Sequence, residues 1–234
     1  SVQRVRIGTW LPLIITLAIQ AMVAMAVMTL PTIAPMAARA LGTSPVYAGV
    51  YVAIVYAGAT TASVLSGMTV LRFGAIRVSQ VGLVLCAAGL ALSTIPSLAV
   101  IAAGAFMIGL GYGPITPASS HILARTTSPS RMSLVFSIKQ TGVPLGGVLA
   151  GAIVPGAALG FGWKNALLAT AAANLASAAI AQVLRAELDA DRDDRRPLTP
   201  VNFLHPIRVV WSIPMLRKLA VCSFVFSLAQ LSLT

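Results

Sequence analysis

The sequence predicts an all-α, polytopic membrane protein, a bundle of six transmembrane helices followed by the start of a seventh. Hydrophobic residues make up 58% of the 234 residues and charged residues only 9%, whereas soluble domains are about 45–50% apolar and about 25% charged. The cations are separated by uncharged stretches long enough to cross a bilayer. All five acidic residues lie between Glu187 and Asp194, so no expected span contains a carboxylate.

The boundaries of the spans follow from the cations and the turn residues. The uncharged stretch between Arg77 and Arg125 is too long for one crossing, so it must turn at residues 93–97, where Ser, Thr and Pro gather. Ser-Pro pairs at 44–45 and 128–129 are typical of helix starts. The expected spans are 10–37, 45–70, 76–95, 97–123, 131–156 and 164–185.

The chain divides into three regions. Residues 1–185 form the expected six-helix transmembrane domain, and the acidic and basic residues of 186–213 form a polar cytoplasmic connector. Residues 214–234 begin a second, C-terminal transmembrane domain. The chain starts without Met and stops inside an apolar run, so we expect it to be a fragment of a longer protein.

Orientation follows from the Lys and Arg residues of alternate loops. Thirteen of the sixteen fall on one side, two (Arg39 and Lys164) on the other, and Lys139 lies inside a span. The positive-inside rule makes the first side, with the N-terminus, cytoplasmic. We expect an integral protein of a bacterial inner membrane, with the lipid bilayer as partner. The net charge of +11 then reflects topology, so nucleic acid is not an expected partner.

A faint internal repeat relates two loops. Residues 71–77 and 159–165 share Leu, Phe and Gly in register. Three spans separate the copies, so they lie on opposite faces of the membrane. This arrangement predicts an inverted three-plus-three repeat.

Two motifs resemble those of the major facilitator superfamily of secondary transporters. In span five, Gly142, Pro144, Gly146 and Gly147 resemble its G-P-x-x-G-G signature, although Val143 separates the first glycine from the proline. Small residues let helices approach closely and proline loosens a helix, which suits an interface between moving halves. Ordinary tight helix packing is the alternative.

The second motif follows span two, where Gly67, Arg72, Gly74 and Arg77 resemble the G-x-x-x-D-R-x-G-R pattern. Leu71 replaces the usual Asp, so the acid of the family's charge relay is missing at this position. The two arginines are then either part of a conformational latch or plain positive-inside anchors. The resemblance implies alternating access, gating roles for the residues of both motifs, and the C-terminal half of the same transporter as partner.

Lys139 is the sharpest candidate for contact with a substrate. It lies about 12 Å into the membrane from Arg131, counted at about 1.5 Å per residue, and a cation at that depth is costly without a partner. A bound anion would provide one. Snorkelling towards the cytoplasm, a carboxylate in the missing half and a structural bond to carbonyls are the alternatives.

Neutral polar residues on spans one, two, four and five complete the expected binding site. They are Gln140, Gln20, Tyr56, Tyr112 and Thr116. Tyr112 and Thr116 are four residues apart and share a helix face. His121, close to Arg125, is either a proton carrier or a solvated helix end.

These observations favour a secondary active transporter that moves a small, anionic solute by alternating access. We expect no enzyme activity, no cofactor and no metal site, because His and Cys lack ligand spacing and the acids are confined to the connector. A transporter-like helical bundle that serves as a scaffold in a larger membrane complex is the alternative.

Overall fold

The computed structural model describes residues 10–193, 208 and 210–232. These residues contain six helices long and apolar enough to cross a membrane, and the predicted all-α bundle is confirmed. The six spans cover Trp10–Thr32, Tyr47–Phe73, Ala75–Leu92, Leu98–Thr126, Pro129–Phe161 and Trp163–Leu188.

The first span is shorter than the sequence suggested, because the helix ends at Thr32 and the chain turns at Ile33. Helix α1 (Trp10–Thr32) contains Pro31 in its last turn, and a short helix α2 (Ala34–Leu41) follows. Spans two and three are the unbroken helices α3 (Tyr47–Phe73) and α4 (Ala75–Leu92). Span six consists of α9 (Trp163–Ala181) and, after a short 3₁₀ turn, α10 (Arg185–Leu188).

Spans four and five are each interrupted. Span four consists of α5 (Leu98–Tyr112) and α6 (Ile115–Thr126), which are separated at Gly113 and Pro114 because proline lacks a backbone N–H. Span five consists of α7 (Met132–Gln140) and α8 (Gly142–Phe161), which are separated at Thr141. Irregular backbone inside a membrane is tolerated where protein or a cavity surrounds it.

A stripe of small residues joins spans five and one. The buried residues of α8 recur at every fourth position: Gly142, Gly146, Ala150, Val154 and Ala158. This face packs against α1. A Cβ atom added at Gly146 would meet the Ala21 carbonyl oxygen and come within 2.6 Å of the Ala24 Cβ. The missing side chain therefore lets the two backbones touch, as small residues do between membrane helices.

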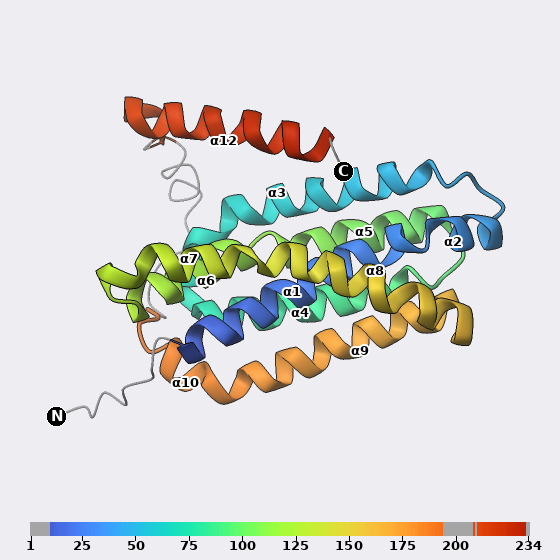
Figure 1. Cartoon of the computed structure of the whole chain (residues 1–234), viewed down its shortest axis with the longest axis horizontal. Helices are drawn as coiled ribbons and strands as arrows, with labels where there is room; N and C mark the ends of the chain where they lie inside the picture. Colours follow the sequence, from blue (N-terminus) through green and yellow to red (C-terminus); the bar gives the residue numbers. More distant parts are fainter. Residues whose placement is uncertain (1–9, 194–207, 209, 233–234) are drawn as a thin grey trace. The chain divides into compact units, whose positions relative to one another are not determined.

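Two junction glycines support the inverted repeat. Gly74 is the single residue between α3 and α4, with φ 93° and ψ 149°, and Gly162 joins α8 to α9 with φ 87° and ψ 150°. A residue with a side chain rarely adopts such a positive φ, so each junction requires glycine. The α8–α9 junction lies at the same end of the bundle as α2, and α6 and α10 lie at the other (Figure 1).

The chain forms two compact units, Ser1–Asp194 and Arg195–Thr234. The first unit extends nine residues beyond the expected boundary at 185, because the first residues of the predicted connector pack against it. The rest of that connector, apart from residues 208 and 210–213, lies outside the described residues, as does the N-terminal segment 1–9 whose location was predicted. In the second unit, α12 (Pro214–Ser232) is a helix at the position of the expected seventh span.

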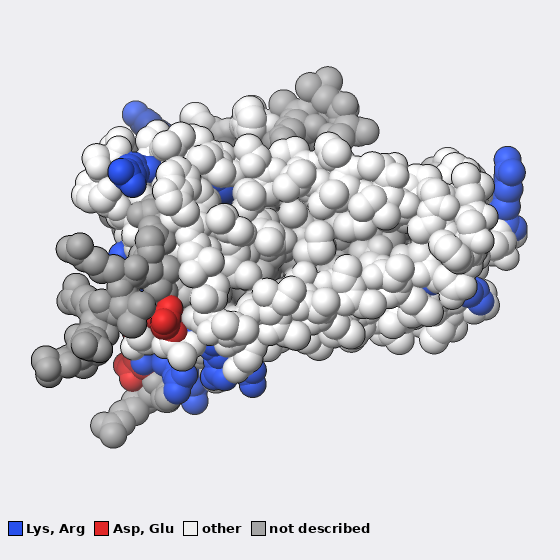
Figure 2. Space-filling model, turned by 60° about the horizontal axis from the view of Figure 1, so that its bottom comes forward, with Lys and Arg blue, Asp and Glu red and all other residues white. Residues whose placement is uncertain are grey.

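Most of the charged side chains in view lie at one end of the six-helix unit and a few lie at the other, with a long, almost uncharged surface between them (Figure 2). We call the end that carries the α3–α4 junction and the α6 C-terminus the basic end. Its described cations include Arg72, Arg77, Arg125, Arg131 and Arg185.

The orientation is open to a direct test. We expect a reporter fused after Asp193 to be cytoplasmic and one inserted at Gly42 to be periplasmic, since Lys and Arg are retained on the cytoplasmic side. Alkaline phosphatase and green fluorescent protein fusions report the two locations with opposite signals. The reverse pattern would overturn the predicted topology.

Candidate functional site

Lys139 lies in the last turn of α7 and is almost completely buried, with 2% of its surface exposed. Its Nζ donates to the Ser120 hydroxyl at 2.9 Å and to the Thr116 carbonyl at 3.3 Å. The ammonium also lies over the Phe136 ring, 5.9 Å from its centroid. The side chain thus ties the two interrupted spans together where each is broken.

The described partners of the Lys139 ammonium are all uncharged. No carboxylate of the described residues forms an ion pair with it. An ammonium has three N–H donors, and the described contacts account for two of them. The structural hydrogen bond to a carbonyl, one of the alternatives for Lys139, is therefore observed with Thr116. The third N–H of the ammonium remains for a further acceptor.

Gln20 is the second buried polar residue close to the break in span five. It lies in the middle of α1 with 2% of its surface exposed. Its stem packs against Gly142, where an added Cβ would lie 3.1 Å from the Gln20 Cβ. The side-chain oxygen has no hydrogen-bond partner among the described residues, which is costly in an apolar interior. Gln140, in contrast, is exposed.

Tyr56 and Tyr112 form a separate aromatic pair. Their ring centroids are 6.5 Å apart and the planes meet at 83°, an edge-to-face arrangement. Thr116 contributes its carbonyl rather than its hydroxyl to the lysine, and its side chain is exposed. The break between α5 and α6 separates Tyr112 from Thr116, so the expected continuous face is interrupted.

The structure thus brings Lys139 and Thr116 together, pairs Tyr56 with Tyr112 and places Gln20 beside Gly142. Phe136 was missed by the sequence analysis. Its position three residues before Lys139 on one helix face is the signal that identifies it.

The residues expected to have gating roles differ in their surroundings. Gly142 and Gly146 contact α1, whereas an added Cβ at Gly147 or Gly67 would meet no described atom within 4 Å. Pro144 is exposed. Arg72 lies over the Phe73 ring at 5.4 Å.

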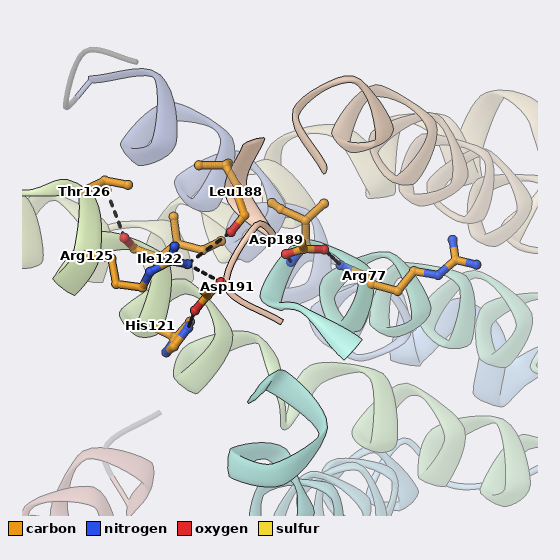
Figure 3. Close-up of polar contacts among 9 residues, drawn as sticks. Arg77, His121, Ile122, Arg125, Thr126, Leu188, Asp189 and Asp191 are labelled. Carbon is orange, nitrogen blue, oxygen red and sulfur yellow. Dashed lines mark hydrogen bonds and ion pairs between the residues drawn. The ribbon is translucent and has the colours of Figure 1, made fainter. Parts of the chain in front are cut away.

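Arg77 takes part in a contact that the sequence analysis did not anticipate (Figure 3). Its backbone N–H and that of Ile76 donate to the carboxylate of Asp189, which was expected to lie in the polar connector. Burial raises the pKa of Asp189 above its ordinary value, and the two N–H donors and Arg185 act in the opposite direction.

One hollow lies away from these residues. It has a volume of about 360 Å³ and is lined by the ends of α1 and α2 and the starts of α3 and α5, including Leu30, Ala37 and Tyr51. None of the residues expected to bind substrate lines it. Its lining is almost entirely apolar, so it offers little to orient a charged solute.

Six apolar spans, two of them broken beside a buried lysine, define an integral membrane protein with a transporter-type fold. The sequence matches the model of the Major Facilitator Superfamily over residues 16–234. The chain belongs to this superfamily.

Solved structures of peptide transporters share the fold. A crystal structure of the peptide transporter POT in complex with sulfate gives a TM-score of 0.66 at 18% identity, covering 94% of this chain and 46% of that one. A POT mutant gives 0.66 at 21% identity, covering 94% and 45%, and its complex with alafosfalin gives 0.65 at 20%, covering 94% and 45%. The chain therefore spans less than half the length of these transporters. Comparison with curated proteins gave no significant match.

Proposed function

We propose that the chain is the N-terminal half of a secondary transporter that moves a small anionic solute by alternating access. The observation that carries this proposal is the buried ammonium of Lys139, which has no carboxylate partner among the described residues. A cation in the membrane interior is expensive unless it is paired. Neutral acceptors offset part of this cost, and an anion with access to the third N–H donor would offset more.

The surroundings of Lys139 are suited to a site that changes during transport. Its partners Thr116 and Ser120 lie on α6, whereas Lys139 lies on α7, so a movement at either helix break alters the contact. The unpartnered amide oxygen of Gln20 is available to a hydroxyl or amine on the solute. Broken helices near the midplane are a recurrent setting for substrate sites in secondary transporters.

Uptake into liposomes by the full-length gene product tests this proposal. We expect saturable uptake of at least one anion from a panel of sulfate, inorganic phosphate and small mono- and dicarboxylates, and none of matched neutral amides. Uptake with and without a pH gradient identifies coupling to protons. Selective uptake of neutral solutes would contradict the proposal that the solute is anionic. No uptake of any solute would favour the alternative of a scaffold in a larger membrane complex.

A further inference from the structure

Asp189, the first residue after span six, holds the start of span three. Its Oδ1 accepts the Ile76 N–H at 2.7 Å and its Oδ2 accepts the Arg77 N–H at 3.0 Å. The first N–H groups of a helix have no partner within the helix and carry partial positive charge. Its side chain is fully buried, and a Cβ added at Gly74 would lie 2.5 Å from Oδ2. The junction glycine therefore leaves the space that this carboxylate occupies.

Asp191, two residues further, binds the end of span four (Figure 3). Its Oδ2 lies 2.6 Å from the His121 Nε2, and its other oxygen forms an ion pair with Arg125. Arg125 also donates to the Leu188 carbonyl at 3.4 Å. Two side chains of α6 thus hold the segment that follows span six.

Asp193 completes the contact with span two. Its backbone N–H donates to the carbonyl of Leu71, in the last turn of α3, at 3.0 Å. Residues 188–193 therefore bind the ends of spans two, three and four at once. We call this segment the acidic clasp.

At the equivalent junction, at the other end of the bundle, no described residue makes such a contact. The repeat relates the amides of Ile76 and Arg77 to those of Lys164 and Asn165, at the start of α9. An added Cβ at Gly162 would meet no described atom within 4 Å. Because the two junctions share one backbone conformation, the fold itself does not require a carboxylate at either. Within the described part of the chain, the acidic clasp is thus an addition at the basic end.

We propose that the acidic clasp makes spans two, three, four and six move as one body at the basic end and ties the start of the connector to that body. Opening it would break the two charge-assisted hydrogen bonds between the Asp189 carboxylate and the helix-start amides, which opposes release. The proposal concerns the six-helix unit itself and does not rest on the identity, or the existence, of a transported solute.

Hydrogen–deuterium exchange of the full-length gene product in lipid nanodiscs tests the acidic clasp. In Asp189→Asn, we expect protection of the Ile76 and Arg77 amides to fall about tenfold or more, the loss expected for a charge-assisted hydrogen bond. The Asp193 amide should lose protection together with them, because the segment is held as a unit. The amides of Lys164 and Asn165 are the internal control, and Glu187→Gln, at an exposed acid just before the acidic clasp, is the matched variant.

A glycine pair provides an independent test. Gly74→Ala and Gly162→Ala impose the same unfavourable φ, but only the first places a Cβ against the Asp189 carboxylate. We expect only Gly74→Ala to deprotect Asp193. Should Asp189→Asn fail to fold, the less buried Asp191→Asn is expected to deprotect Asp193 as well. Unchanged protection at Ile76 and Arg77, or its loss with Asp193 unaffected, would reduce Asp189 to a local helix cap or less and overturn the proposal.

Discussion

Lys139→Ala should reduce uptake of the anionic solute by about tenfold to a hundredfold, the range expected when a hydrogen bond to a charged group is lost. The variant should still fold, because the lysine's described partners are a carbonyl, a hydroxyl and an aromatic ring. All three are uncharged, so removing the lysine leaves no buried charge without a partner. Lys139→Arg should retain part of the activity, since it keeps the charge with a different donor geometry.

Initial uptake rates and yields from size-exclusion chromatography measure the two effects separately. Lys164→Ala is the matched control, because that lysine is exposed at the end of the bundle that lies opposite the basic end. A well-folded Lys139→Ala protein with normal affinity for every anion that it transports would contradict the binding role. A loss of yield before any loss of uptake would instead indicate a buried carboxylate partner elsewhere in the full-length protein.

Gly146→Leu should abolish transport while leaving membrane insertion intact. A Cβ added at Gly146 would already overlap the Ala21 carbonyl oxygen. It would lie 2.6 Å from the Ala24 Cβ and 2.8 Å from the Met25 amide nitrogen. Overpacking typically costs about 1–3 kcal/mol, and here it would also push span five away from span one. Uptake assays and thermal unfolding in detergent measure the loss of transport and of stability.

Gly147→Leu is the matched control for Gly146→Leu. It has the same change in hydropathy one residue along α8, where an added Cβ would meet no described atom within 4 Å. We expect it to leave the thermal stability of the six-helix unit unchanged. Normal transport and stability in Gly146→Leu would remove the packing role from this glycine. Lost transport in Gly147→Leu at normal stability would assign Gly147 to the interface with the second half.

The spans could be predicted from the sequence because their physical cause is one-dimensional. A crossing requires a minimum length without charge, and the spacing of Arg6, Arg39 and Arg72 displays that length directly. The repeat was visible for a related reason. Only glycine adopts the backbone conformation of the junctions readily, so Gly74 and Gly162 hold their places in both copies.

The partners within the site could not be predicted in the same way. The depth of Lys139 follows from counting residues, but its acceptors lie on another broken helix and one of them is a backbone carbonyl, which carries no sequence signal. Asp189 was misplaced because an acid in a charged stretch is ordinarily solvated. The two backbone amides that donate to its carboxylate are 113 and 112 residues away in the sequence.

The break at Thr141 also affects the electrostatic field inside span five. An intact helix carries its partial charges, each of about half an elementary charge, only at its two ends. Because α7 ends at Gln140 and α8 begins at Gly142, a negative pole and a positive pole lie within the span. Lys139 belongs to the last turn of α7, and a negative helix pole favours a cation in that turn. Among the described residues, the Lys139 ammonium is thus held by backbone dipoles and a hydroxyl, without an ionised side chain beside it.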